Sequence, residues 1–389
     1  MTAKQQPYHR LTQFKTPCFI VDRALLKKNL SVLQEVKHRT GCGILLALKG
    51  FAMHAVFPDL APVLDGVCAS SPHEARMGRT RFGKEVHAFA AAYGDDDFSE
   101  ILQSADHIVF NSMGQYRCFE NEVKRAVKDD PARYTFGLRI NPEHRETEVE
   151  LYDPCAPFSR LGIISRHFPA ALPEHITGLH FHTLCEKNAD ALERTLAAAE
   201  EKFHSHFKQC EWVNFGGGHH ITREDYDVDM LCRLVNGFKK KYGVQVYLEP
   251  GEAVALNTGF LVASVLDVVE NGMPVAVLDM SAAAHTPDVL EMPYRPYALG
   301  SGEKGEKRYS YRLAGLSCLA GDVVGDYSFD EPLERGSKIV FTDMAHYSMV
   351  KTNTFNGIKL PDIYYVDSNQ GQVLFHKSFG YTDFESRLS

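Results

Sequence analysis

The chain has 389 residues, of which 44% are hydrophobic and 24% charged, a composition ordinary for a globular protein with one large and one smaller domain. Its formal net charge of -8 argues against a nucleic-acid binder and suits a small cationic substrate. Residues 1–14 are polar, without the apolar core of a signal peptide, and no segment has the apolar length of a membrane span, so we expect a cytoplasmic protein.

The first half of the chain alternates between short apolar runs and helical patterns. Residues 18–21 form a short strand, and Asp22 then caps an amphipathic helix. Residues 44–48 are five apolar residues between glycines, too few for a helix, and predict a buried strand that ends at Lys49. Seven further strands are expected at residues 66–70, 86–91, 107–111, 134–141, 176–183, 212–215 and 244–249.

Helical patterns between these runs supply the crossovers that parallel strands need. Ser71-Pro72-His73-Glu74 is a capping box with proline at the first helical position, and Ala189–Phe207 is a long amphipathic run. Eight strand–helix units in roughly 230 residues match a parallel (β/α)8 barrel better than an open doubly wound sheet.

After Glu252 the pattern changes to strands without intervening helices, at residues 260–269, 275–280, 308–317, 338–342, 363–366 and 373–376. The strand at 18–21 has no place among the eight barrel units. We therefore predict a barrel over residues 22–257 and an all-β domain made of residues 1–21 and 258–389.

Cysteine usage indicates neither a disulfide framework nor a zinc site. The nine cysteines are an odd, scattered set without a Cys-x-x-Cys pair. Free thiols and no bound metal are expected.

The active site of a parallel barrel lies at the carboxyl ends of its strands. Each candidate is weak alone, because a glycine triplet can be a tight turn, a histidine a core residue and a carboxylate merely solvated. The strand ends carry Lys49, Ser70, Asn111, Arg139 with Asn141, His182, Gly216-Gly217-Gly218 and Glu249.

Together these groups match one ligand, pyridoxal 5'-phosphate. Its aldehyde forms a Schiff base with a lysine and its phosphate accepts backbone N–H groups, while its ring stacks on an imidazole and its pyridine nitrogen stays protonated beside a carboxylate. The glycine triplet is neither a dinucleotide fingerprint nor a P-loop, so nucleotide binding is not indicated.

The ordered set Lys49, Phe181-His182, Gly216-Gly217-Gly218, Glu249-Pro250-Gly251, Cys318 and Tyr347 resembles the alanine-racemase-fold group of basic amino-acid decarboxylases over nearly the whole chain. Within that group, four stretches are most similar to the carboxynorspermidine/carboxyspermidine decarboxylases. These are Leu48-Lys49-Gly50-Phe51, Cys68-Ala69-Ser70-Ser71-Pro72-His73-Glu74, Pro287-Asp288-Val289-Leu290-Glu291-Met292-Pro293-Tyr294 and Ser317-Cys318-Leu319-Ala320-Gly321-Asp322.

The resemblance implies a role for each matching residue. It implies that Lys49 carries the Schiff base, Cys318 comes from the second subunit of a homodimer to return a proton to the substrate carbon, and Tyr347 contacts the phosphate. The other implied cofactor contacts are His182 on the ring, Glu249 at the pyridine nitrogen, Gly217 and Gly218 at the phosphate, and Gly251 and Arg139.

The chain departs from its relatives in two places, with Glu252 where many have arginine and Leu319 where they often have an acid. An anion at 252 removes a phosphate contact and favours a substrate ammonium. We therefore assign substrate amines to Glu252, Asp288 and Asp322, although Asp288 could instead be a turn residue after Pro287.

The implied function is decarboxylation of carboxynorspermidine or carboxyspermidine to norspermidine or spermidine. One alternative is another basic substrate such as diaminopimelate or ornithine, but the second carboxylate of diaminopimelate would need a cation where Glu252 stands. The other is a catalytically dead regulatory relative, against which the retention of Lys49, Glu249 and Cys318 argues.

Overall fold

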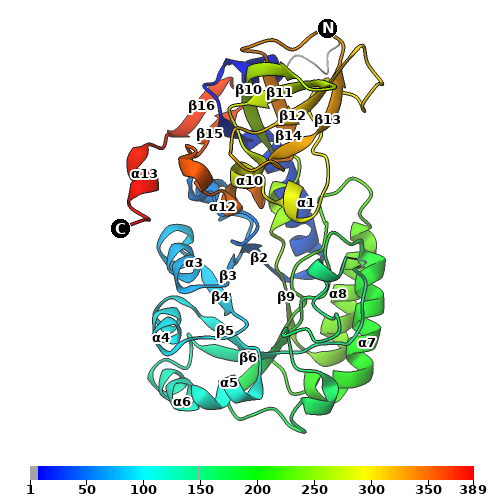
Figure 1. Ribbon diagram of the computed structural model, residues 1–389. Coiled ribbons are helices and arrows are strands. Elements are labelled where there is room, and N and C mark those ends of the chain that lie inside the picture. The colour runs from blue at the N-terminus through cyan, green and yellow to red at the C-terminus, as the bar shows by residue number, and fades with distance from the viewer. Residues whose placement is uncertain (1–7, 148) are drawn as a thin grey trace. The chain divides into compact units, whose positions relative to one another are not determined.

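The computed structural model describes residues 8–147 and 149–389, which divide into two compact units. One unit is Asn29–Val254, and the other combines the chain up to Lys28 with Ala255–Ser389. Each has its own sheet, a closed barrel in the first and an open mixed sheet in the second (Figure 1).

The barrel confirms the predicted (β/α)8 architecture. Neighbouring strands pair in parallel in chain order, and pairing of Gly43 with Tyr247 closes the ring. The strands are β2 (Gly43–Ala47), β3 (Gly66–Ala69), β4 (Glu85–Phe89), β5 (His107–Phe110), β6 (Thr135–Arg139), β7 (Ile176–His180), β8 (Trp212–Asn214) and β9 (Gln245–Leu248).

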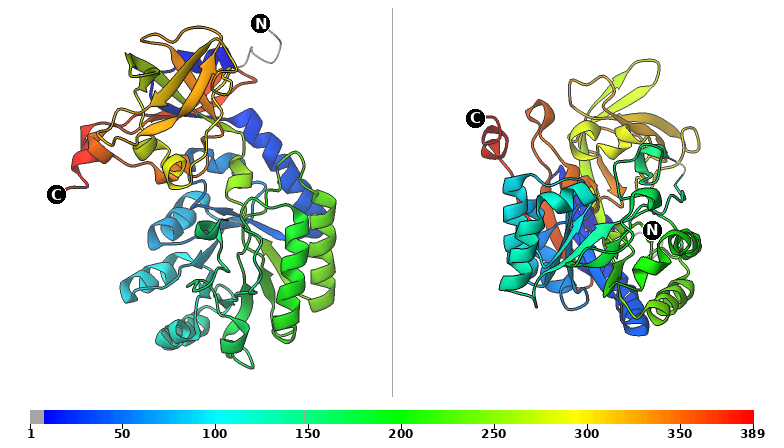
Figure 2. Two further views of the ribbon diagram at one scale, coloured as in Figure 1. Left: turned by 45° about the vertical axis from the view of Figure 1, so that its right-hand side comes forward. Right: turned by 90° about the horizontal axis from the view of Figure 1, so that it is seen from below.

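Helices surround the barrel strands, and α7 and α8 stand side by side on its outer face (Figures 1 and 2). The predicted cap at Ser71 forms, since its Oγ accepts the Glu74 N–H at 3.2 Å. The α-helices are α1 (Arg23–Thr40), α2 (Phe57–Leu60), α3 (Pro72–Met77), α4 (Asp95–Ser104), α5 (Met113–Cys118), α6 (Glu120–Asp129), α7 (Ala189–Phe207), α8 (Val228–Tyr242) and α9 (Glu252–Ala255), with shorter turns η2 (His54–Val56) and η3 (Gly78–Phe82).

One crossover differs from the expected strand–helix alternation. Between β6 and β7 the described residues contain only two short 3-10 turns, η4 (Glu150–Tyr152) and η5 (Ser165–His167). Prolines interrupt this segment at 142, 154, 157, 169 and 173, and each removes a helical N–H and clashes with the preceding turn. The prediction of a helix in every crossover is therefore wrong here.

The second unit contains an eight-stranded sheet in the order β13-β12-β11-β10-β1-β15-β16, with β14 also paired to β10. β1 runs antiparallel to β10 and parallel to β15, which confirms that the N-terminal strand joins the β domain. The strands are β1 (Cys18–Asp22), β10 (Gly259–Glu270), β11 (Pro274–Leu278), β12 (Tyr309–Ala314), β13 (Val323–Phe329), β14 (Lys338–Thr342), β15 (Asp362–Asp367) and β16 (Gln372–Lys377).

Two features of this unit differ from expectation. β13 was not predicted, because Gly325 and Asp326 interrupt its apolar alternation. Short helices also occur in this unit, and none is long enough to show helical periodicity. They are α10 (Ala282–His285), α11 (Asp288–Glu291), α12 (Ser348–Lys351) and α13 (Tyr381–Glu385), with the 3-10 turns η1 (Tyr8–Gln13) and η6 (Phe355–Gly357).

Packing inside the barrel requires small residues beside a large one. A Cβ on Gly178 would lie 1.9 Å from Cε2 of the buried Trp212, so only glycine fits there. The β unit has a separate apolar core that includes Phe19, Leu261 and Tyr327.

All nine cysteines are unpaired thiols, as predicted. No helix in the part of the chain that the structure describes is long and apolar enough to cross a membrane.

Candidate active site at the carboxyl ends of the barrel strands

Lys49 lies in a tight turn two residues after the end of β2. The N–H groups of Gly50 and Phe51 both donate to Ala47 O, at 3.0 and 3.2 Å, and the Lys49 side chain is exposed. The turn packs against the one after β9, where a Cβ on Gly251 would lie 3.1 Å from the Ala47 Cβ. The amine is therefore carried on a closely packed turn at the barrel mouth.

Glu249, directly after β9, is a largely buried carboxylate with two polar neighbours. Asn214 Nδ2 donates to its Oε1 at 2.8 Å, and His180 Nε2 lies 3.5 Å from its Oε2. Burial acts to raise the pKa of Glu249, but His180 and the Asn214 hydrogen bond outweigh it and lower the pKa to about 2. The carboxylate is therefore ionised at neutral pH.

His182 has a neutral imidazole and is held by hydrogen bonds to both its side chain and its main chain. Its Nδ1 accepts the Gly217 N–H at 2.8 Å, which leaves the ring proton on Nε2, and its carbonyl accepts from Arg139 Nη2 at 2.9 Å. Burial lowers the pKa of His182 well below its usual value, and the nearby charge of Lys49 lowers it further. This ring offers an uncharged flat face.

Arg139 is buried and supports His182 from the end of β6. Its guanidinium also lies over the Phe89 ring, 4.6 Å from the centroid. Burial lowers the pKa of Arg139 to about 10, which leaves it charged at neutral pH. It positions the histidine through the His182 carbonyl.

The glycine turn after β8 is shaped so that no Cβ fits. A Cβ on Gly217 would lie 2.5 Å from Glu249 O, and one on Gly218, whose φ is +80°, would lie 1.9 Å from Leu184 O. Within the described chain, the N–H groups of Gly218 and His219 donate no hydrogen bond, whereas that of Gly217 is used by His182. Gly218 and His219 thus offer adjacent backbone donors, and His219 was not among the predicted residues.

Glu252, at the start of α9, is oriented by a histidine that the sequence did not single out. His220 Nε2 lies 3.3 Å from Glu252 Oε1, and His220 Nδ1 lies 3.2 Å from Arg223 Nη1. Because arginine can only donate, His220 Nδ1 accepts and its Nε2 carries the proton that faces Glu252. The arrangement places an imidazole N–H beside the Glu252 carboxylate.

The other strand-end residues have structural partners. Asn111 Nδ2 donates to the carbonyls of Ala91 and Arg160, and Asn141 Oδ1 accepts the Glu143 N–H. Ser70 donates its N–H to Glu74 Oε2 at 2.6 Å. These residues hold the loops around the barrel mouth.

Four predicted site residues belong to the β unit. Cys318 is exposed in the loop between β12 and β13, and Tyr347, at the start of α12, has a left-handed backbone with φ +52°. Asp288 forms an ion pair with Lys351, which also pairs with Glu291. Asp288 therefore has a lysine partner within its own unit.

Asp322 is buried, and its carboxylate is used by main-chain donors. Oδ1 accepts the N–H groups of Ala282 and Ala283 at 2.7 and 3.3 Å, and Oδ2 accepts that of Ser317 at 3.0 Å. Since these bonds occupy both oxygens, the geometry favours an anchor for the Cys318 loop over a contact with a substrate amine.

A second cluster of polar side chains lies in the amino-terminal parts of β4 and β5, away from the carboxyl ends of the strands. It consists of Glu85, His87 and His107, and each has an atom that could bind a metal ion, all within 4.8 Å of one another. The two imidazole rings stack 3.8 Å apart with an angle of 9° between their planes. The nitrogen lone pairs of two parallel rings point in parallel directions, whereas binding one metal ion requires the lone pairs to converge on it. We therefore interpret the two histidines as a stacked aromatic pair.

The chain resembles known proteins over nearly its whole length. A family model described as "Pyridoxal-dependent decarboxylase, C-terminal sheet domain" matches residues 18–345. The chain is 43% identical to the carboxynorspermidine/carboxyspermidine decarboxylase of Campylobacter jejuni, over 96% of this chain and 99% of that protein. It is 42% identical to the carboxyaminopropylagmatine decarboxylase of Synechocystis sp., over 97% of each chain.

A solved structure shares the fold at similar identity. The crystal structure of carboxynorspermidine decarboxylase from Campylobacter jejuni, complexed with norspermidine, superposes with a TM-score of 0.88 at 41% identity, covering 96% of this chain and 100% of that one.

Proposed function

Because the chain belongs to the family of pyridoxal-dependent decarboxylases, we propose that it decarboxylates carboxynorspermidine, carboxyspermidine or both, to give norspermidine or spermidine. The observation that carries the proposal is identity of 43% over nearly the full length of a relative with this activity. The anionic Glu252 in the barrel unit supports it, since both substrates carry several amines.

The barrel mouth fits pyridoxal 5'-phosphate, the cofactor of this family. An amine, an ionised buried carboxylate, a neutral imidazole face and a turn without Cβ atoms are all present. When bound, the cofactor would supply an aldehyde that condenses with an amine and a protonated ring that accepts the electron pair left on the substrate carbon when carbon dioxide departs.

In the proposed mechanism some residues would contact the cofactor and others position those residues. Lys49 would provide the amine that holds the cofactor and that later displaces the product. Glu249 would keep the proton on the pyridine nitrogen, and His182, held by Arg139, would cover one ring face. Gly218 and His219 would hold the phosphate, while Gly217 orients His182 and Gly251 allows the Lys49 turn to pack closely. A phosphate contact of Tyr347 is proposed from its resemblance to the wider decarboxylase group alone.

Substrate amines are assigned to Glu252 and Asp288. Glu252 is oriented through His220, and Asp288 would exchange its pairing with Lys351 for a substrate ammonium. We now assign Asp322 to the Cys318 loop, since both its oxygens accept main-chain hydrogen bonds.

We also propose a homodimer in which Cys318 of one subunit returns the proton to the substrate bound in the barrel of the other. The basis is the resemblance of Cys318 and Tyr347 to residues of the wider decarboxylase group. Location in the cytoplasm likewise stays a prediction from the sequence.

The substrate assignment predicts a ranking of carbon dioxide release by the purified, cofactor-loaded enzyme. Carboxynorspermidine and carboxyspermidine should be turned over with kcat/KM values within about 100-fold of each other, since one methylene changes binding by about 1–3 kcal/mol. Diaminopimelate and ornithine should be much poorer substrates. Carboxyaminopropylagmatine belongs in the same assay, because a relative with that activity is equally similar; preference for it or for diaminopimelate would overturn the assignment.

Glu252→Gln is expected to raise KM for the polyamine substrate by about tenfold, because a charge-assisted contact with an ammonium is lost. Cofactor affinity should not fall, since a carboxylate makes no attractive contact with a phosphate. Steady-state kinetics and a cofactor titration measure the two effects. Glu100→Gln, an exposed position on α4, is the matched control. Loss of cofactor with unchanged substrate KM would show that Glu252 serves the cofactor instead.

A further inference from the structure

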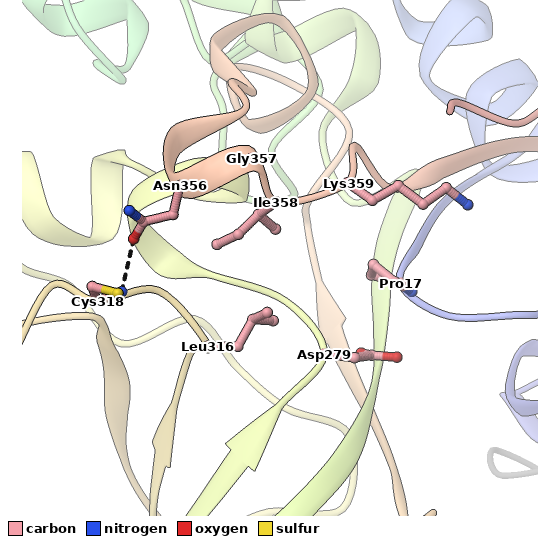
Figure 3. Close-up of a pocket in the computed structure, with 8 residues that line it drawn as sticks. All are labelled: Pro17, Asp279, Leu316, Cys318, Asn356, Gly357, Ile358 and Lys359. Atoms are coloured by element: carbon pink, nitrogen blue, oxygen red, sulfur yellow. Dashed lines mark hydrogen bonds between the residues drawn. The ribbon is translucent and has the colours of Figure 1, made fainter. Parts of the chain in front are cut away.

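The loop that carries Cys318 is fixed by hydrogen bonds from two directions. On one side, Asp322 Oδ2 accepts the Ser317 N–H at 3.0 Å, and Oδ1 of the same carboxylate accepts the Ala282 N–H at the start of α10. On the other side, Asn356 Oδ1 accepts the N–H of Cys318 itself at 2.7 Å. Figure 3 shows the Asn356 side chain reaching Cys318 across the end of a pocket that both residues line.

Asn356 is well placed for this contact because its own segment is anchored. Asn353 donates its N–H to Ala284 O at 2.8 Å and its Nδ2 to Ala283 O at 3.0 Å, and its Oδ1 accepts the Phe355 N–H at 2.9 Å. The Asn353–Asn356 segment and the Cys318 loop are therefore both tied to α10.

The backbone of Asn356 is left-handed, with φ 57° and ψ 16°. Among residues with a side chain, asparagine and aspartate adopt this conformation most readily, and glycine adopts it at no steric cost. Asparagine at 356 thus meets two requirements, the left-handed backbone and an oxygen that reaches the Cys318 N–H.

We propose that Asn356 is a positioning residue, which fixes the main chain of Cys318 and so determines where that thiol is presented for proton return. The role rests on the proposed function, in which Cys318 gives a proton to the substrate carbon. Asn356 contributes no proton and acts only through the Cys318 main chain.

Asn356→Gly tests the proposal, because glycine keeps the left-handed backbone and removes only the hydrogen-bond acceptor. In the holoenzyme we expect the Cys318 amide to exchange with deuterium about fivefold faster, and kcat to fall about fivefold at unchanged KM, as suits the loss of one hydrogen bond. The Ser317 amide, held by Asp322, should keep its protection. Asn356→Asp keeps the acceptor and should restore both values.

Asn257→Gly is the matched control, since Asn257 is also left-handed, at φ 56°, in the same unit. Unchanged exchange at Cys318 in Asn356→Gly would overturn the proposed contact, and faster exchange with unchanged kcat would overturn the positioning role. Cys318→Ala separates this proposal from the proposed function. If that variant kept full turnover, the role of Cys318 would fail, whereas the amide exchange of Asn356→Gly would still report on the contact.

Discussion

Replacing Lys49 with alanine is expected to abolish the visible absorbance of bound pyridoxal phosphate and to lower kcat by at least about 10³-fold, because Lys49 is the amine assigned to form the covalent link to its aldehyde. Lys49 is the exposed amine on the turn after β2, and its charge helps to lower the pKa of His182. An absorption spectrum of the purified variant and an assay of carbon dioxide release give the two readouts.

Lys49→Arg is the matched variant for this experiment. Arginine keeps the positive charge beside His182 but does not condense with an aldehyde at neutral pH, since it stays protonated. It should therefore lose absorbance and turnover as alanine does. If Lys49→Arg kept the absorbance or the turnover, only the charge at this position would matter. If Lys49→Ala kept both, the assignment of Lys49 to the cofactor would be wrong.

Two inactive variants, each with a different substitution, should regain activity when one subunit of each forms a heterodimer. In a heterodimer of Lys49→Ala with Cys318→Ala, one shared site collects both substitutions and the other has neither. Heterodimers isolated through two different affinity tags are therefore expected to recover about half of wild-type activity, whereas each variant alone stays nearly inactive.

The control pairs two substitutions of the same barrel. Lys49→Ala combined with Glu249→Gln leaves one defect in every site, because both residues lie on adjacent turns of one unit, after β2 and β9. That pair should stay inactive. Equal activity of both heterodimers, or no recovery in the first, would contradict a site shared between subunits.

Local sequence pattern was sufficient for the architecture. Alternating apolar runs and amphipathic segments reflect the burial of every barrel strand, so β2 to β9 and α7 could be located from residue order alone. The crossover between β6 and β7 and the strand β13 could not, since prolines in one and Gly325-Asp326 in the other remove the periodic signal.

Strand order also supplied most of the candidate site residues. Lys49, His182, Glu249 and the start of the glycine turn come within two residues of the ends of barrel strands, and the carboxyl ends of parallel strands meet at one face. The sequence by itself therefore determined the fold class, the family resemblance and the amine, imidazole and carboxylate of the candidate site.

Only the tertiary structure decided how these side chains are paired. Asn214 with Glu249, Gly217 with His182, and Asn356 with Cys318 are contacts between residues 35 to 38 positions apart. The burial of Asp322 among main-chain donors likewise has no local signal. Such hydrogen bonds depend on where separate loops come to lie in space, and neither periodicity nor residue type carries that information.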